Sequence, residues 1–278
     1  MNKKLLKYRR LILSALLSGL MILTVGCCVD PNCNDDYDDE DGRYSEVINT
    51  HQAIPLSTQT LFYLEAINGR IDIEGTTADS VVYVWANKKV KANSQWEADR
   101  YLEELEVRVS SNSGGVSVET RQPSKRNVTF IVDYRIVIPE WLDVNVEHVN
   151  GDITMDDLSG EIQVYLTNGD VKFLDCLSSI WTNLTNGQVD ANLALPQNGT
   201  CNFSITNGTI KLMVPDSTNA EFDAGIVNGS IAISGLNMTD SEVSNKSAKG
   251  MLGSGEGMIK LRVTNGAIRV KGLSGNEG

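Results

Sequence analysis

Apolar and polar residues alternate along most of the chain, and the dipeptide Asn-Gly interrupts the alternation at regular intervals. The motif Asn-Gly-x-(Ile/Val) occurs at Asn68-Gly69, Asn150-Gly151, Asn168-Gly169, Asn186-Gly187, Asn207-Gly208, Asn228-Gly229 and Asn265-Gly266. From Asn150 to Asn228 the spacings are 18, 18, 21 and 21 residues. A period of this size is typical of a repeat architecture.

The positions around each Asn-Gly indicate which side chains face a core. Apolar residues recur six, four and two positions before the Asn, and three and five positions after it. In the copy at Asn168 these residues are Ile162, Val164, Leu166, Val171 and Phe173. A period of two on both sides of the motif predicts two short strands per repeat, each with one buried face.

The length of the repeat separates three β architectures. Asn-Gly is a strong hairpin signal, but a hairpin meander reverses about every 8 to 12 residues. A left-handed hexapeptide helix needs an inward aliphatic residue at every sixth position, whereas six-residue steps from Val144 reach Asn150 and Asp156. The pattern therefore predicts an all-β, single-domain parallel β-helix or solenoid with short coils. We expect a right-handed coil because parallel crossovers are right-handed.

The Asn-Gly pairs are predicted to be structural corners of the coils. A tight corner needs residues with positive φ, and Asn and Gly adopt that conformation most readily. Equivalent positions of stacked coils lie about 4.8 Å apart, so the Asn side chains can form a hydrogen-bonded ladder. We therefore expect ligands to bind on the faces between the corners.

Two segments depart from the repeat. Ser94 and Glu97 form a capping box, and the apolar spacing that follows predicts a short helix over 94–104. Trp96 and Tyr101 are expected on its buried side, and the helix is expected to cover an open end or flank of the solenoid. Residues 237–257 alternate poorly and are interpreted as one degenerate coil with a Gly-rich loop.

The first residues indicate export and lipid attachment. A cationic start precedes the apolar run Leu11–Leu23, which is too short for a comfortable membrane span and is typical of a secretory signal. Gly26-Cys27 then resembles a bacterial lipobox, with Cys27 as the acylated N-terminus of the mature protein. We predict a lipoprotein signal peptide at 1–26, an acidic flexible tether at 27–45 and the β-solenoid domain at 46–278.

Charge and cysteine content exclude several functions. The formal net charge of −12 becomes −17 when the five cationic residues of the signal segment are removed. Nucleic acids require basic patches, so they are not expected as partners, and contact with a membrane is expected through the lipid alone. No spacing of Cys and His is typical of zinc. Cys176 and Cys201 occupy apolar positions and are expected to be buried free thiols, although a disulfide between them stays open.

The combination of these features resembles a known family. The lipobox, the acidic tether, the run Tyr134-Arg-Ile-Val-Ile-Pro139, the repeated Thr-Asn-Gly-x-Ile and the closing Gly253-Ser-Gly-Glu-Gly257 are similar to the bacterial β-solenoid family named "putative adhesin". The resemblance covers roughly residues 60–273. It implies a parallel β-helix exposed at the cell envelope, with adhesion as the expected role. It brings no catalytic residues.

Candidate binding residues lie on the faces between the corners. Tyr165 and Trp181 fall between inward positions of neighbouring repeats, so both are expected to point outward and form a ligand or partner surface. Asp152 and Asp170 follow the corner Gly in adjacent repeats and are weak candidates for a shared calcium or acid–base site. Their column continues as Gln188 and Thr209, which favours a solvated polar corner. His148 is expected to be a packed histidine, and no cofactor is expected.

These observations predict a non-catalytic, lipid-anchored protein of the bacterial cell envelope that acts as an adhesin-like interaction or structural protein. The expected location is the outer membrane, with surface exposure, and the expected ligand is a glycan or a protein. Two alternatives remain open. One is a glycan-binding or glycan-active β-helix protein, and the other is a regulatory partner in the envelope stress response.

Overall fold

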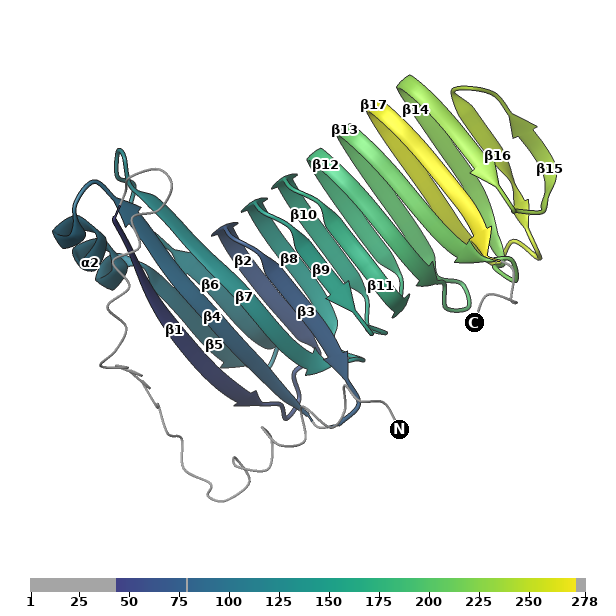
Figure 1. Ribbon diagram of the computed structural model, residues 1–278. Coiled ribbons are helices and arrows are strands. Elements are labelled where there is room, and N and C mark those ends of the chain that lie inside the picture. The colour runs from purple at the N-terminus through teal and green to yellow at the C-terminus, as the bar shows by residue number, and fades with distance from the viewer. Residues whose placement is uncertain (1–43, 79, 274–278) are drawn as a thin grey trace. The chain divides into compact units, whose positions relative to one another are not determined.

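The computed structural model describes residues 44–78 and 80–273 (Figure 1). The predicted signal peptide, Cys27 and the acidic tether up to residue 43 lie outside the described residues. The elements before the regular repeats are β1 (Tyr44–Pro55), β2 (Leu61–Asn68), β3 (Ile71–Thr76), β4 (Val81–Ala92), α2 (Gln95–Glu104), β5 (Glu106–Asn112), β6 (Gly115–Arg121) and β7 (Thr129–Pro139). They are followed by β8 (Asp143–Asn150), β9 (Ile153–Asp156), β10 (Ile162–Asn168), β11 (Val171–Leu177), β12 (Ile180–Ala194), β13 (Thr200–Pro215), β14 (Ala220–Ser234), β15 (Met238–Val243), β16 (Ser247–Leu252) and β17 (Gly257–Leu273).

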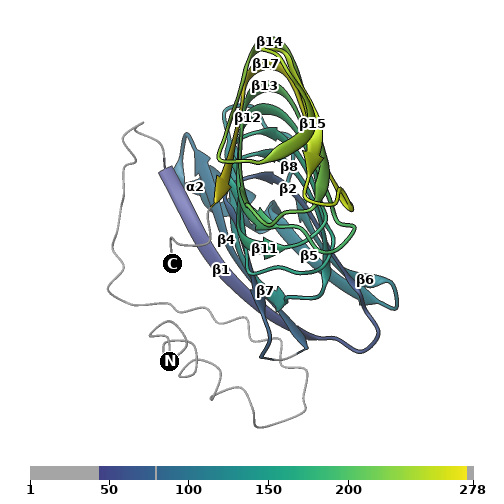
Figure 2. The same ribbon diagram turned by 90° about the vertical axis from the view of Figure 1, so that its right-hand side faces the viewer.

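Each coil has two strand segments that meet at an Asn-Gly corner. Figure 2 looks along the stack and shows the segments converging at the corner and diverging away from it. We call the surface of the segments before the corners the pre-corner face, and the surface of those after it the post-corner face. Neighbouring coils pair in parallel and in register, with Asn168 opposite both Asn150 and Asn186. The predicted parallel stack of short coils is therefore present.

The coils do not stack in sequence order. The coil formed by β2 and β3 lies between the β6/β7 strands and the β8/β9 coil. At the other end, β17 lies between β13 and β14 and pairs in parallel with both. The first and last coils of the sequence are thus each enclosed by two neighbours. Spacing along the chain carries no information about this interleaving.

Antiparallel strands complete both ends of the stack. At one end β1 pairs with β4, β4 pairs with β7, and β5 pairs with β6. At the other end β16 pairs with β14, and β15 pairs with β16. The expectation of a degenerate coil over 237–257 was wrong, because these residues form an antiparallel hairpin. His51 lies within β1.

The inward columns form one continuous core between the two faces. The positions predicted from the alternation are buried, except that Ile231 and Ile233 are partly buried. Phe62, Phe173, Phe203 and Phe222 are among the largest fully buried side chains. Phe173 from the post-corner face stacks on Phe203 from the pre-corner face, with 5.8 Å between ring centroids. This contact spans the interior and fixes the separation of the two strand layers.

The helix α2 begins as predicted, but its buried side differs from the expectation. The Ser94 hydroxyl accepts the Glu97 amide at 3.3 Å and caps the first turn. The helix buries Ala98 and Leu102 and contacts β1 and β4, so it covers this end of the core. Trp96 is 65% exposed. The prediction that Trp96 faces inward was wrong, because Ala98 and Leu102, four residues apart, share the buried side of the helix and Trp96 projects from another side.

Candidate functional site

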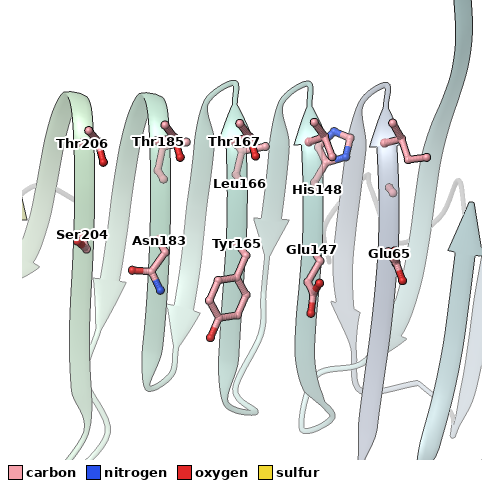
Figure 3. A pocket seen from close by; sticks show the side chains of 14 residues that line it. Glu65, Glu147, His148, Tyr165, Leu166, Thr167, Asn183, Thr185, Ser204 and Thr206 are labelled. Carbon is pink, nitrogen blue, oxygen red and sulfur yellow. The ribbon is translucent and has the colours of Figure 1, made fainter.

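A groove runs across five adjacent strands of the pre-corner face and has a volume of about 420 Å³. It is formed by outward side chains at two positions of each coil, because alternate residues of a strand point to the same face. Figure 3 shows the lower row as Glu65, Glu147, Tyr165, Asn183 and Ser204. The upper row, next to the corners, contains Ile67, Val149, Thr167, Thr185 and Thr206. The strands that form the floor lie within the stack.

Tyr165 and Trp181 lie where the sequence pattern placed them. Tyr165 is opposite Asn183, and Trp181 is opposite Gln163, so the two aromatic residues are on adjacent strands of the same face. Tyr165 is 46% exposed and lines the groove, whereas Trp181 is partly buried and lies one row below it. The structure therefore brings the predicted pair onto one surface, with Tyr165 as its most accessible member.

Glutamates line the end of the groove nearest β2. Glu65 and Glu147 lie directly opposite each other on β2 and β8. Tyr63 lies beside them, and its pKa is raised to about 12, first by burial and then by the negative charge of Glu147 and Glu65. These glutamates were not predicted as site residues. Glu65 and Glu147 share a position three residues before an Asn, but a single outward acid at that position does not by itself indicate a site.

His148 lies beneath the corner at the same end of the stack. It is 4% exposed, and its Nε2 is 2.9 Å from the carbonyl oxygen of Gly69. A carbonyl only accepts, so Nε2 carries the proton. Nδ1 is buried without a partner among the described residues. Burial lowers the pKa of His148, and the surrounding backbone carbonyls oppose that shift. His148 is therefore a packed neutral histidine.

The seven corner asparagines form an unbroken side-chain ladder. Each Nδ2 donates to the Oδ1 of the next asparagine at 2.8–2.9 Å. In stack order the ladder runs through Asn228, Asn265, Asn207, Asn186, Asn168, Asn150 and Asn68. It ends where Asn68 donates to the carbonyl oxygen of Phe130 at 3.0 Å. The predicted ladder is confirmed.

Within each Asn-Gly corner, only the glycine adopts positive φ. The glycine φ values run from 129° to 151°, and none of the seven asparagines is in that region. The expectation that both residues share this role was therefore wrong for Asn. Close stacking adds a second reason for Gly, because a Cβ on Gly187 would lie 1.9 Å from the carbonyl oxygen of Gly169. The Asn-Gly corners therefore have a structural role.

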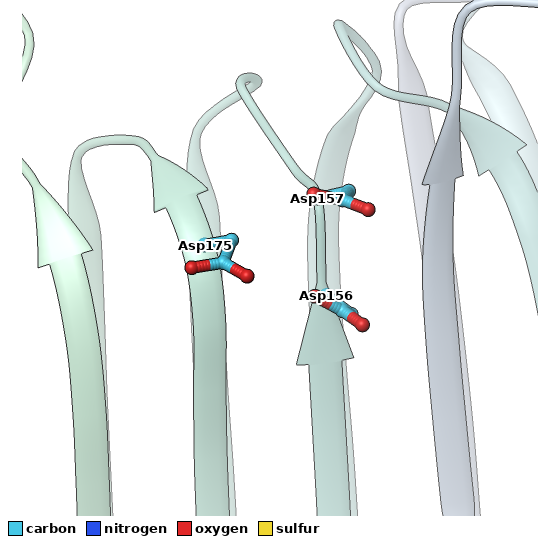
Figure 4. Close-up of side chains that lie close together, drawn as sticks. All are labelled: Asp156, Asp157 and Asp175. Carbon is cyan, nitrogen blue, oxygen red and sulfur yellow. The ribbon is translucent and has the colours of Figure 1, made fainter. Parts of the chain in front are cut away.

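Asp152 and Asp170, the candidate acidic pair, also accept hydrogen bonds at the corners. The Asp152 carboxylate accepts the Asp170 amide at 2.9 Å, and the Asp170 carboxylate accepts the Gln188 amide at 2.8 Å. Each carboxylate thus links one coil to the next. A different group of acids, Asp156, Asp157 and Asp175, has carboxylate oxygens within 4.8 Å of one another (Figure 4). Loop geometry, not column position, gathers this group.

A second hollow of about 330 Å³ lies on the post-corner face. Trp85 lies beside it, stacked on His51 at 4.7 Å between centroids, with the Arg135 guanidinium 5.6 Å from its ring. Asn49 and Asn87 hydrogen-bond to each other on another side. Because His51 and Arg135 flank the Trp85 ring, its faces are already in contact with protein groups.

The remaining candidate groups are buried or structural. Cys176 and Cys201 are free and buried, as expected. Burial raises the pKa of Cys176 to about 11 and raises that of Cys201 further, so both thiols are protonated at neutral pH. Among the described residues, no helix is both long and apolar enough to cross a bilayer.

The fold and its surface define a class, the β-solenoid repeat proteins with a polar groove on one strand face. The chain belongs to the Toastrack family DUF4097, whose model matches residues 106–271. This range begins with the first residue of β5, so β1–β4 and α2 precede it. The family assignment supports the sequence resemblance at the level of the domain. No curated protein matches the chain.

Solved structures to which the chain is similar come from Clostridium, Bacteroides and Parabacteroides species. A "putative cell adhesion protein" from Clostridium sporogenes shares 14% identity at a TM-score of 0.44, covering 82% of this chain and 100% of that one. A "putative adhesin" from Bacteroides fragilis shares 11% identity at a TM-score of 0.35, covering 82% and 97%. Another from Parabacteroides merdae shares 11% at a TM-score of 0.25, covering 80% and 95%. At these TM-scores the likenesses carry no argument about function.

Proposed function

We propose that this protein is an adhesin-like interaction protein of the bacterial cell envelope, and that it binds its ligand on the pre-corner face without catalysis. The observation that carries the proposal is the groove beside Tyr165, with Trp181 on the same face. A stack of in-register coils holds these side chains in fixed positions, which reduces the entropy lost on binding. The inward residues repeat, whereas the outward ones differ from coil to coil, so specificity can be encoded there.

The test is binding of the full chain to a panel of host and bacterial surface glycans and proteins. We expect the double substitution Tyr165→Ala with Trp181→Ala to abolish binding to the ligands that the wild type recognises. Trp141→Ala is the matched control, because Trp141 is 48% exposed and lies outside the groove. Equal binding by the double variant and the wild type would remove the pre-corner face as the ligand surface.

The proposed attachment to the envelope is through lipid at Cys27. Support comes from the sequence, in which a cationic start and a short apolar run lead into Gly26-Cys27. In cells fed a labelled fatty acid, we expect label on the wild type and none on Cys27→Ser. The outer membrane fraction should contain the wild type. Label that persists on Cys27→Ser would contradict this anchor and leave the ligand surface untouched.

A further inference from the structure

The acidic end of the pre-corner groove has a charge arrangement that the fold does not require. Glu65 on β2 lies directly opposite Glu119 on β6 at one side and directly opposite Glu147 on β8 at the other. Like charges in this relation destabilise a sheet. Arg121 pairs with Glu119 at 2.9 Å and also attracts Glu65 over a longer distance, but within the described part of the chain no salt bridge reaches Glu65 or Glu147. Two acids without an ion pair therefore lie where the groove begins.

The neighbouring Tyr63 does not neutralise this pair. Burial, followed by its interactions with Glu147 and Glu65, raises the pKa of Tyr63 and keeps the phenol protonated. A phenol has one proton to donate, so it satisfies one carboxylate at a time and adds no positive charge. A cation supplied from solution would interact favourably with both glutamates.

Tyr165 continues the groove directly from this acidic end. It lies opposite Glu147 on the next strand, and nearly half of its surface is exposed. Beyond it the groove presents Asn183 and Ser204, with a row of threonines above them. The amide and hydroxyl groups of these residues both donate and accept hydrogen bonds. The order along the groove is thus anion, aromatic ring, and then neutral polar groups.

The backbone of the groove floor favours a sugar over an extended peptide. The strands β2, β8, β10, β12 and β13 each pair with neighbours on both sides. Extended peptides commonly bind β proteins by adding a strand at an unpaired edge, and this floor offers none. A pyranose needs no such edge, because it stacks an apolar ring face on an aromatic side chain and exchanges hydrogen bonds through its hydroxyls.

We propose that the groove binds a glycan chain containing an amine-bearing sugar, an inference that rests on the proposed function. The protonated amine lies between Glu65 and Glu147, an adjoining ring stacks on Tyr165, and further hydroxyls bond to Asn183 and Ser204. Polyanionic glycans are excluded, because the same two carboxylates repel them. The ligand class is therefore set by the negative charge at one end of the groove and by the aromatic and polar side chains along the rest of it.

The test is calorimetric titration of the purified full chain with three hexasaccharides at mildly acidic pH. The probes are a chitosan oligomer with free amines, its N-acetylated chitin counterpart and an oligogalacturonate. We expect the chitosan oligomer to bind tightest and the galacturonate not to bind. Tyr165→Ala should weaken chitosan binding about tenfold. Glu147→Gln should weaken it about threefold or more, with less dependence on salt.

Matched controls are Glu221→Gln, an exposed acid on β14 outside the groove, and Trp141→Ala. Equal binding of chitin and chitosan, with no effect of Glu147→Gln, would overturn the amine assignment while the proposed ligand surface survives. Hexalysine that binds as tightly as chitosan, independently of Tyr165, would overturn the glycan assignment in favour of a basic peptide. Wild-type binding to cell surfaces that is insensitive to both Tyr165 and Trp181 would remove the proposed function itself.

Discussion

At the scale of single residues, the two corner residues have different physical roles. The glycine has positive φ and permits the close approach of successive backbones. The asparagine contributes a side-chain amide whose donor and acceptor are both used by neighbouring coils. A hydrogen bond contributes only modestly to the net free energy of folding, but a partly buried group that is left without its partner destabilises the fold by more than that. Each asparagine inside the ladder therefore needs two other asparagines to satisfy its side-chain hydrogen bonds.

Substitution of an asparagine inside the ladder should lower the free energy of unfolding more than substitution of the asparagine at its end. Asn168→Ala leaves the Asn150 acceptor and the Asn186 donor without partners. We expect a loss of about 1–3 kcal/mol in the free energy of unfolding, measured by urea denaturation. Asn228→Ala is the control, since Asn228 is exposed and bonds only to Asn265 within the ladder. Equal losses for the two variants would contradict a cooperative ladder.

The buried His148 predicts a dependence of stability on pH. Burial lowers its pKa in the folded protein below the ordinary value of 6.5, so the unfolded chain binds the proton more readily. Protonation would place a donor at the unpartnered Nδ1. The contribution of His148 to stability should therefore be complete above about pH 6.5 and decline as the pH falls towards its folded-state pKa.

The measurement is urea denaturation of the wild type and His148→Leu at pH values on both sides of that window. Leucine is the control side chain because Leu166 and Leu184 occupy the same inward position in the next two coils. We expect the variant to lose less stability than the wild type on acidification. His51 also has a pKa lowered by burial, but it is common to both proteins. Identical pH profiles would show that His148 does not titrate in this range.

At the scale of elements, the helix shows how packing selects one face of a sequence with several apolar residues. The sequence favours Trp96 as an inward residue because it is large and apolar. The structure buries Ala98 and Leu102 instead, and the exposed Trp96 ring contacts the Arg100 guanidinium at 5.3 Å. Residues four apart share one side of a helix, so Ala98 and Leu102 face the core together, while Trp96 and Arg100 share a different side.

Alanine substitutions in α2 should separate these two roles. Leu102→Ala is expected to lower the free energy of unfolding by about 2–5 kcal/mol, because it removes a buried side chain and leaves a cavity. Trp96→Ala should change it by less than about 1 kcal/mol, since a surface residue has few contacts to lose. Thermal or urea denaturation measures both. A larger loss for Trp96→Ala than for Leu102→Ala would contradict the observed face of the helix.

At the scale of the whole folded unit, the interleaving protects the first and last coils from unravelling. In a sequential solenoid the last coil has one neighbour and can separate by itself. Here the last strand, β17, is enclosed by β13 and β14, and the first coil is enclosed in the same way. Separating the first or the last coil therefore requires loss of pairing on two sides. A protein that binds at a surface would gain resistance to mechanical detachment.

Deletion of residues 257–278 should therefore disrupt more than the last coil. Without β17, β14 keeps only its antiparallel pairing with β16, and the parallel edge of β13 becomes exposed. We expect hydrogen exchange to show loss of protection from residue 216 onward, together with aggregation through the free edges. Protection of β14 equal to that in the intact chain would contradict this dependence. Protection of β8–β12 should persist as an internal control.

Several features of the fold and the site were accessible from the sequence because they repeat. The period of two determined the inward columns, and the outward positions of Tyr165 and Trp181 followed directly from them. The glutamates of the groove were missed because a single acidic residue on an outward position has no distinguishing signal. Glu65 and Glu147 are 82 positions apart, and only the insertion of the β2/β3 coil brings them together.

The sequence by itself determined the coil, its two faces, its Asn-Gly corners and the residues of its core, because these depend on local geometry repeated at short spacing. Only the tertiary structure decided the order in which the coils stack. That order depends on which strand edges find partners once the chain has folded, and no local pattern records it. The acidic end of the groove is a product of that order, since it joins strands from two distant parts of the chain.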